Sequence, residues 1–137
     1  MKPADIRVIE EVTSATTLDS IHALLAEVFA EHAIDDMHAM QFELGVAEIG
    51  ANIVEHSGGS EPVALRLEIE ALTGHIEARY IDDGQPAHVD LGAVSLPDEF
   101  AERGRGIAIA LNVLDELSYR RVDRKNYWRL VRNLTSP

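Results

Sequence analysis

Cysteine is absent from the 137-residue sequence. Its absence excludes disulfides, thiol catalysis and thiolate metal sites, so any metal would have to bind oxygen or imidazole ligands. The chain also lacks an apolar run long enough to cross a membrane, and residues 1–5 lack the apolar segment of a signal peptide. We therefore expect a cytoplasmic protein that makes no membrane contact.

Positive charge is scarce, because 12 basic residues face 24 acidic ones and the formal net charge is -12. Such a charge repels phosphate backbones and argues against direct nucleic-acid binding. Most of the basic residues nevertheless fall after residue 102. That segment either binds a polyphosphate or an acidic partner, or simply balances the surface charge, and the sequence leaves both readings open.

What the chain does contain is an ordinary globular composition, with 46% hydrophobic and 26% charged residues. Its length suits one domain with a real core and is too short for two. Residues 1–137 are therefore predicted to form a single domain.

Hydrophobic periodicity predicts the order strand, two helices, two strands, loop, helix, two strands. Thr16, with Asp19 three residues later, is predicted to cap the first helix, which runs to about residue 32, and Asp35 or Asp36 to cap the second. The other predicted elements are a strand near Ile6 and Val8, a hairpin over 63–80, a loop over 82–106, a helix over 107–117 and a final hairpin over 119–134, with residues 57–60 ending the second helix. The predicted fold class is α+β: a two-layer sandwich of a mostly antiparallel mixed sheet with helices on one face.

A polar stripe runs along the otherwise apolar second helix through Gln41, Gly45, Glu48, Asn52 and Glu55. Glu48 and Asn52 stand four residues apart, so their side chains lie on the same helix face. A carboxylate and an amide oxygen can activate a hydroxyl group and hold a cation such as Mg²⁺. Gly45 would let another group approach the helix closely. The competing interpretation is the solvated face of an amphipathic helix.

Two further segments carry candidate binding residues. Residues 82–86, Asp-Asp-Gly-Gln-Pro, follow a predicted strand, where a carboxylate is held rigidly and a glycine lets a planar ligand approach. Residues 103–106, Arg-Gly-Arg-Gly, precede a predicted helix, whose exposed N–H groups and dipole favour an anion. Taken singly, the first is also typical of a simple turn and the second of a simple connection.

Together and in this order, the three segments resemble the GHKL (Bergerat-fold) ATPases, specifically the anti-sigma-factor serine kinase branch. The Glu-x-x-x-Asn box of that family is similar to residues 48–52, with His56 following, and its Asp-x-Gly box to residues 82–84. The Gly-rich box resembles residues 102–107, and residues 114–117 are similar to the end of the helix that follows it. The resemblance covers roughly residues 15–134.

The resemblance implies a role for each matching residue. Glu48 would be the general base that accepts a proton from the attacking hydroxyl, and Asn52 would place Mg²⁺ against the phosphates of ATP. Asp82 would accept a hydrogen bond from the adenine amino group, with Gly84 packing near the base.

The resemblance assigns the phosphates to the Gly-rich box. The amides around Gly104, Arg105 and Gly106 would cradle them, and Arg105 would add charge near the γ-phosphate. Residues 86–103 would form a short lid over the nucleotide.

The implied function is phosphorylation of a serine or threonine on an anti-sigma antagonist of the STAS type by a factor that otherwise sequesters a sigma factor, with a homodimer as the implied assembly. Two positions depart from the family pattern. Pro86 replaces a second glycine, and residues 125–128, Lys-Asn-Tyr-Trp, replace a Gly-Thr pair before the last strand. These departures motivate the alternative of a partner-binding module without kinase activity. A third alternative is a different target, such as a response-regulator-like protein.

Two side-chain types invite other hypotheses. His32 and His38 are close in sequence, but their spacing does not place them on one helix face, so no structural metal is expected there. Trp128, with Leu130 and Leu134, is predicted to be strand core rather than a platform for stacking bases.

Overall fold

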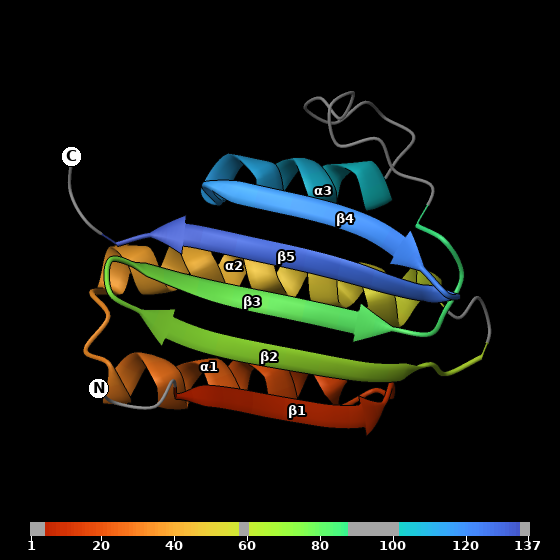
Figure 1. Cartoon of the computed structure of the whole chain (residues 1–137), viewed down its shortest axis with the longest axis horizontal. Coiled ribbons are helices and arrows are strands. Elements are labelled where there is room, and N and C mark those ends of the chain that lie inside the picture. Colours follow the sequence, from red (N-terminus) through yellow and green to blue (C-terminus); the bar gives the residue numbers. More distant parts are fainter. Residues whose placement is uncertain (1–4, 58–60, 88–101, 135–137) are drawn as a thin grey trace.

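The computed structural model describes residues 5–57, 61–87 and 102–134 (Figure 1). Five strands form one sheet, and three helices cover a single face of it. This arrangement confirms the predicted two-layer α+β sandwich and the predicted order of its elements. Those elements are β1 (Ile6–Val12), α1 (Thr17–Glu31), α2 (Asp36–Asn52), the π-helical turn η1 (Ile53–Ser57), β2 (Ala64–Leu72), β3 (His75–Asp82), α3 (Glu102–Val113), β4 (Glu116–Val122) and β5 (Lys125–Asn133).

The strand order in the sheet is β1-β2-β3-β5-β4, and each of these neighbouring pairs is antiparallel. The sheet of the described residues is thus wholly antiparallel, without the parallel pair that a mixed sheet would contain. A tight turn connects the two strands of each hairpin. Gly74 has φ 83° in the turn between β2 and β3, and Asp123 and Arg124 have φ 52° and 67° in the turn between β4 and β5. Positive φ at both central residues, as at Asp123 and Arg124, is the geometry of a type I′ hairpin turn.

The core lies between the sheet and the helices. Alternate residues of each inner strand point into it, and Trp128 is buried against Tyr119, with ring centroids 4.6 Å apart. The prediction that Trp128 belongs to the core is therefore confirmed. The largest fully buried side chains are Trp128, Tyr80, Phe42, Ile21, Leu25, Ile49, Ile53, Leu67, Ile69, Ile76, Ile107 and Leu130.

Helix α2 lies unusually close to its neighbours because of two glycines. A Cβ atom at Gly50 would stand 2.6 Å from the hydroxyl of Tyr80, which donates to the carbonyl of Val46 at 2.7 Å. Burial raises the pKa of Tyr80, so this hydroxyl stays a donor. A Cβ atom at Gly45 would stand 2.9 Å from Leu114, which is the close approach expected at Gly45.

The two predicted helix caps have different outcomes. Asp35 caps α2 as predicted, since its Oδ1 accepts from the N–H of His38 at 3.0 Å. Thr16 makes no side-chain cap bond, so the predicted capping box is wrong. Its backbone (φ -103°, ψ 1°) is not extended, and the buried Thr17 instead accepts from the N–H of Ser14 at 2.8 Å.

Helix α3 is displaced from its predicted position at 107–117, since it begins at Glu102 and ends at Val113. The chain leaves the helix because the N–H of Asp115 bonds to the carbonyl of Val131 at 2.8 Å, after which Glu116 and Leu117 pair with β5. Residues 114–117 therefore lead into β4 rather than end a helix. After α2, the π-helical turn η1 continues as far as Ser57. Residues 57–60 were predicted to end this helix, and residues 58–60 lie outside the described residues.

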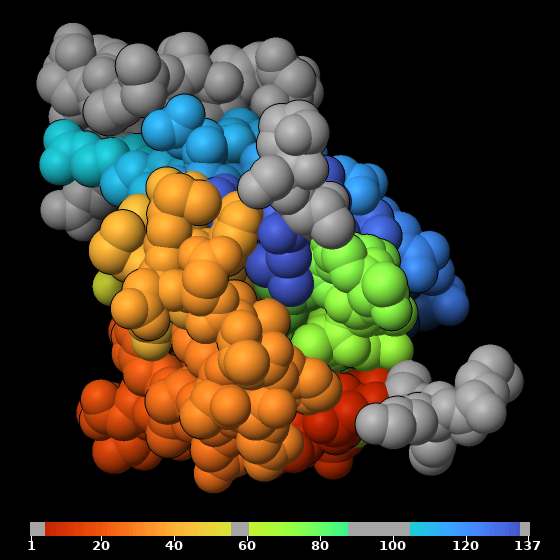
Figure 2. Space-filling view, turned by 90° about the vertical axis from the view of Figure 1, so that its left-hand side faces the viewer, coloured from red at the N-terminus to blue at the C-terminus, as the bar shows by residue number. Residues whose placement is uncertain are grey.

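Figure 2 views the sandwich from the end where α1 passes into α2, in orange, and β2 turns into β3, in green. The helical layer and the sheet stand side by side in this view, as they do in Figure 1. No helix of the described residues is both long and apolar enough to cross a membrane.

Candidate functional site

Three elements that carry candidate residues meet at the opposite end of the sandwich. Helix α2 and strand β3 both end there, and α3 begins there (Figure 1). The antiparallel sheet brings this about, because α2 and β3 run in the same direction while α3 runs back over them. The three segments, residues 48–52, 82–86 and 103–106, therefore lie at one edge of the fold.

Glu48 and Gly106 are in direct proximity across the α2–α3 packing. A Cβ atom at Gly106 would lie only 2.7 Å from Oε2 of Glu48, so the glycine makes room for the carboxylate. Glu48 is half-buried, and Asn52, one turn further along α2, is 7% exposed. The polar stripe of α2 is thus covered by α3 at this point and is not simply a solvated helix face.

The Gly-rich segment lies within α3, not in a loop before it. Gly104 is in the first turn, where N–H groups have no partner inside the helix, and Arg105 and Gly106 follow directly. Arg105 is exposed. The start of a helix is in general a favourable place for an anion, but Arg105 and Gly106 lie inside α3 and not in a loop before it.

Asp82 is the last residue of β3, and its side chain is only 1% exposed. Its Oδ1 accepts hydrogen bonds from the N–H of Gly84 and from Nδ2 of Asn126, both at 2.9 Å. The first bond holds the turn after β3, and the second crosses to β5. The carboxylate is therefore held in one orientation at the sheet end, as the sequence predicted for a residue in this place.

Sequence reasoning missed Asn126 and the two residues of β4 that hold it. The Oδ1 atom of Asn126 accepts from the hydroxyl of Tyr119 and from Nη1 of Arg121. The same Arg121 nitrogen donates to the carbonyl of Gly84 at 2.9 Å. A usable signal existed, because Asn126 shares the inward alternation of Trp128 and Leu130 and is thus a buried polar residue in need of partners.

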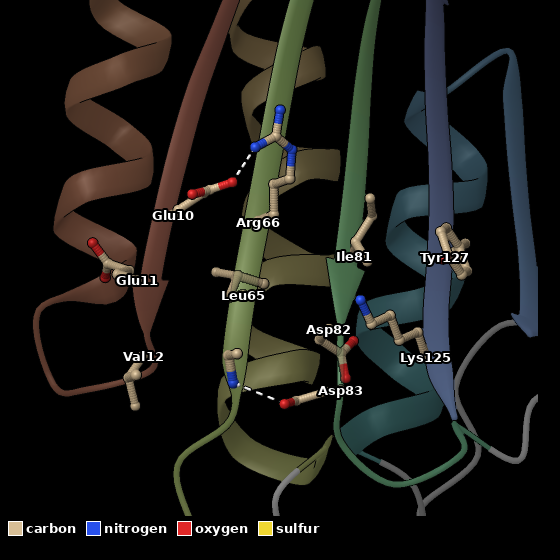
Figure 3. Close-up of a pocket in the computed structure, with 11 residues that line it drawn as sticks. Glu10, Glu11, Val12, Leu65, Arg66, Ile81, Asp82, Asp83, Lys125 and Tyr127 are labelled. Carbon is tan, nitrogen blue, oxygen red and sulfur yellow. Dashed lines mark hydrogen bonds and ion pairs between the residues drawn. The ribbon is translucent and has the colours of Figure 1, made fainter. Parts of the chain in front are cut away.

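A hollow of about 420 Å³ lies on the uncovered face of the sheet, away from the helices (Figure 3). Asp83 lines it and accepts from the N–H of Ala64 at 2.9 Å, while Glu10 pairs with Arg66 across β1 and β2. Glu48, Asn52 and Gly106 do not line it. Asp82 and Asp83, from the second of the three segments, do line it, so the hollow adjoins this part of the edge where the three segments meet.

The described residues include one group with potential metal ligands, formed by Asp5, Glu31 and His32. Arg7 pairs with both carboxylates, and His32 bonds to Asp5. Hydrogen bonds from Arg7 and His32 lower the pKa of Asp5. His38 is elsewhere, where its Nδ1 accepts from Arg132 at 3.0 Å.

Comparison with known protein families shows to which family the chain belongs. The profile of the histidine kinase-like ATPase domain matches residues 12–132. The chain belongs to this family. The match confirms the resemblance to GHKL ATPases that the motifs indicated.

Among solved structures, the crystal structure of the RsbU and RsbW domains of Rv1364c from Mycobacterium tuberculosis has a similar fold. The TM-score is 0.69 at 19% sequence identity, over 98% of this chain and 34% of that chain. This histidine kinase-like ATPase domain thus spans about a third of the length of the chain it resembles. Among curated proteins, no sequence matches it significantly.

Membership of this family implies ATP binding, and the residues at this edge fit a magnesium nucleotide. Glu48 and Asn52 offer the oxygen atoms that Mg²⁺ prefers, and Mg²⁺ on a nucleotide needs only one or two protein ligands. The carboxylate of Glu48 can lie at this edge because Gly106 has no side chain. The start of α3 suits phosphates, and the carboxylate of Asp82 suits an amino group.

Proposed function

We propose that this protein is an ATP-binding anti-sigma regulatory factor that phosphorylates a serine or threonine of a STAS-type anti-sigma antagonist. The observation that carries the proposal is the contact between the α2 carboxylate Glu48 and the start of α3 at Gly106. With Glu48 as the base and the start of α3 as the anion site, the two groups that a phosphoryl transfer requires would lie close together.

The residues of α2 would act on the reacting groups. Glu48 would accept the proton of the serine or threonine hydroxyl and so make its oxygen a better nucleophile. Asn52 would hold Mg²⁺ through its amide oxygen. Bound Mg²⁺-ATP supplies the transferable phosphoryl group and neutralises part of its charge.

The other two elements would bind and orient the nucleotide. Asp82 would accept from the exocyclic amino group of adenine, with Gly84 beside the base. The first-turn amides of α3 at Gly104, together with Arg105 and Gly106, would bind the phosphates. The lid assigned to residues 86–103 falls almost wholly outside the described residues.

Calorimetry with Mg²⁺-ATP tests the binding half of the proposal. We expect saturable binding by the wild-type protein and its loss in Asp82→Asn, because the amide would turn a donor toward the amino group. Binding that is absent in the wild type, or unaffected by Asp82→Asn, would overturn the assignment of the pocket.

Incubation with γ-labelled ATP and a STAS-domain protein tests the catalytic half. We expect label on the STAS protein with the wild type and none with Glu48→Ala, while ATP binding persists. The same preparation can be tested for capture of a sigma factor and for a homodimer, the two further assemblies that this function implies.

A second candidate function is a partner-binding module of the same fold without phosphotransfer. It is favoured by residues 125–128, Lys-Asn-Tyr-Trp, at the start of β5, where the family pattern has a Gly-Thr pair before the last strand. This candidate predicts that the STAS protein is bound but stays unlabelled at any ATP concentration.

A further inference from the structure

Asn126 makes four hydrogen bonds, which is all that its side chain can make. Its Nδ2 donates to Oδ1 of Asp82 at 2.9 Å and to the carbonyl of Gln85 at 2.8 Å. Its Oδ1 accepts from Tyr119 and Arg121. An amide has two donor hydrogens and two acceptor lone pairs, and each finds a complementary partner.

These partners determine which way the amide faces. Arg121 has only donors, so it must meet the amide oxygen, and the carbonyl of Gln85 has only lone pairs, so it must meet the amide nitrogen. Tyr119 extends this network of hydrogen bonds. Its oxygen accepts from the N–H of Ala87 at 3.0 Å, and its hydroxyl donates to Oδ1 of Asn126. A donor is thus always directed at Asp82.

The β4–β5 hairpin therefore holds the orientation of the Asp82 carboxylate. Asn126 is 1% exposed and Asp82 likewise 1%, so water does not compete for this bond. With Oδ1 accepting from Asn126 and from Gly84, the carboxylate cannot rotate without breaking two hydrogen bonds. A carboxylate in this position presents only acceptors.

We propose that Asn126 is a positioning residue that makes the site of Asp82 selective for a purine nucleotide with an amino group, and against one with a keto oxygen, at the 6-position. The inference rests on the proposed nucleotide function and extends it from binding to base selection. A keto oxygen would meet the acceptor of Asp82 without a hydrogen between them, and an unsatisfied buried pair of this kind strongly disfavours binding.

ATP and ITP test the proposal, because the two nucleotides have the same ribose and phosphates and differ in the purine at its 6-position. Calorimetry on the wild type should show ATP bound about a hundredfold more tightly than ITP. In Asn126→Ala, ATP should bind about tenfold more weakly, and the ATP/ITP ratio should fall as well, because the carboxylate loses its orientation. If Asn126 served folding alone, the substitution would weaken the binding of ATP and of ITP equally and leave the ATP/ITP affinity ratio unchanged.

Asn126→Asp adds a pH readout. The titratable or charged groups that contact position 126 in the described residues are Asp82 from β3 and Tyr119 and Arg121 from β4. At pH 8 two carboxylates would face each other and ATP binding should be lost, whereas toward pH 5 the pair can share a proton that donates in place of the amide. Binding should then recover relative to the wild type. Asn112→Asp, at an exposed position in α3, adds the same charge elsewhere and should follow the wild type at each pH.

The outcomes separate the two proposals. A folded wild type that binds neither nucleotide overturns the proposed function. A wild type that binds ATP and ITP equally overturns both the role of Asn126 and the contact of Asp82 with the adenine amino group, but not nucleotide binding itself. A folded Asn126→Ala with an unchanged ATP/ITP ratio overturns the role of Asn126 alone. If circular dichroism shows that Asn126→Ala does not fold, Asn126→Leu replaces it, because leucine keeps the branching of the side chain at Cγ and removes the donor to Asp82. An unchanged ratio in that variant overturns the inference, and a lowered ratio supports it.

Discussion

The two faces of the sheet hold their carboxylates in different ways. On the uncovered face, Glu77 accepts from Arg79 at 2.6 Å and from Arg129 at 2.9 Å. On the helix-covered face, Asp82 accepts from the neutral amide of Asn126 and from the main chain of Gly84. An arginine neutralises its carboxylate, whereas a neutral donor orients the group and leaves its charge available to a ligand. We therefore expect the carboxylate of the first face to contribute to stability, and the proposed function uses the carboxylate of the second face for ligand binding.

The largest expected effect is on the covered face, in Gly106→Ala. The new Cβ would lie 2.7 Å from Oε2 of Glu48 and displace the carboxylate. We expect phosphotransfer to fall about a hundredfold, because a displacement of about 1 Å at a reacting group has that consequence. Alanine also favours the helix, so the urea midpoint should not fall. A variant with wild-type transfer would show that Glu48 is not held in its reactive place by this contact.

Gly50→Ala tests the close packing of α2 on β3 and should affect folding. Its Cβ would stand 2.6 Å from the Tyr80 hydroxyl and 3.0 Å from Ile21. Overpacking of this kind should lower the free energy of unfolding by about 2 kcal/mol in urea titrations. Tyr80→Phe removes the clashing oxygen, so the double variant should be more stable than the sum of the single changes predicts. Strict additivity would contradict the contact.

On the uncovered face, Glu77→Gln should lower the free energy of unfolding by about 1 kcal/mol at pH 7. Burial disfavours the charged form of Glu77, but hydrogen bonds from Arg79 and Arg129 outweigh it and hold its pKa below 4.5. A lowered native pKa stabilises the fold above the unfolded value, and this contribution is lost as the pH falls through the native pKa. The difference between wild type and variant in the free energy of unfolding, measured in urea, should therefore shrink as the pH falls from about 5 to about 3. A difference that grows on acidification would contradict the sign of the shift.

The smallest effect is expected at the edge of the same face, in Glu10→Gln. Glu10 pairs with Arg66, but its side chain is 64% exposed, and an exposed ion pair is screened by water and salt. The urea midpoint should not change measurably in low salt. It should not change at about 0.5 M salt either, where exposed charges are strongly screened. A clear loss that salt abolishes would show that the charges of the uncovered face act as one network.

Periodicity and turn residues alone determined the order of the elements, the hairpins at Gly74 and around residues 123–126, and the core position of Trp128. The structure shortens the second turn to residues 123–124. These are local properties, because a side chain alternates or repeats along its own element whatever lies beside it. The motif residues Glu48, Asn52, Asp82 and Gly84 were found in the same way, from their spacing and from the family resemblance.

Tertiary structure decided the rest. The cap at Thr16 failed because its backbone is not extended and its hydroxyl bonds to the hydroxyl of Ser14. Helix α3 ends at Val113 because Asp115 bonds to β5. The space that Gly106 leaves for Glu48, and the amide of Asn126 on Asp82, each join segments more than 40 residues apart. Such contacts depend on how whole elements pack, and a single sequence carries no local pattern that states which buried polar group will face which.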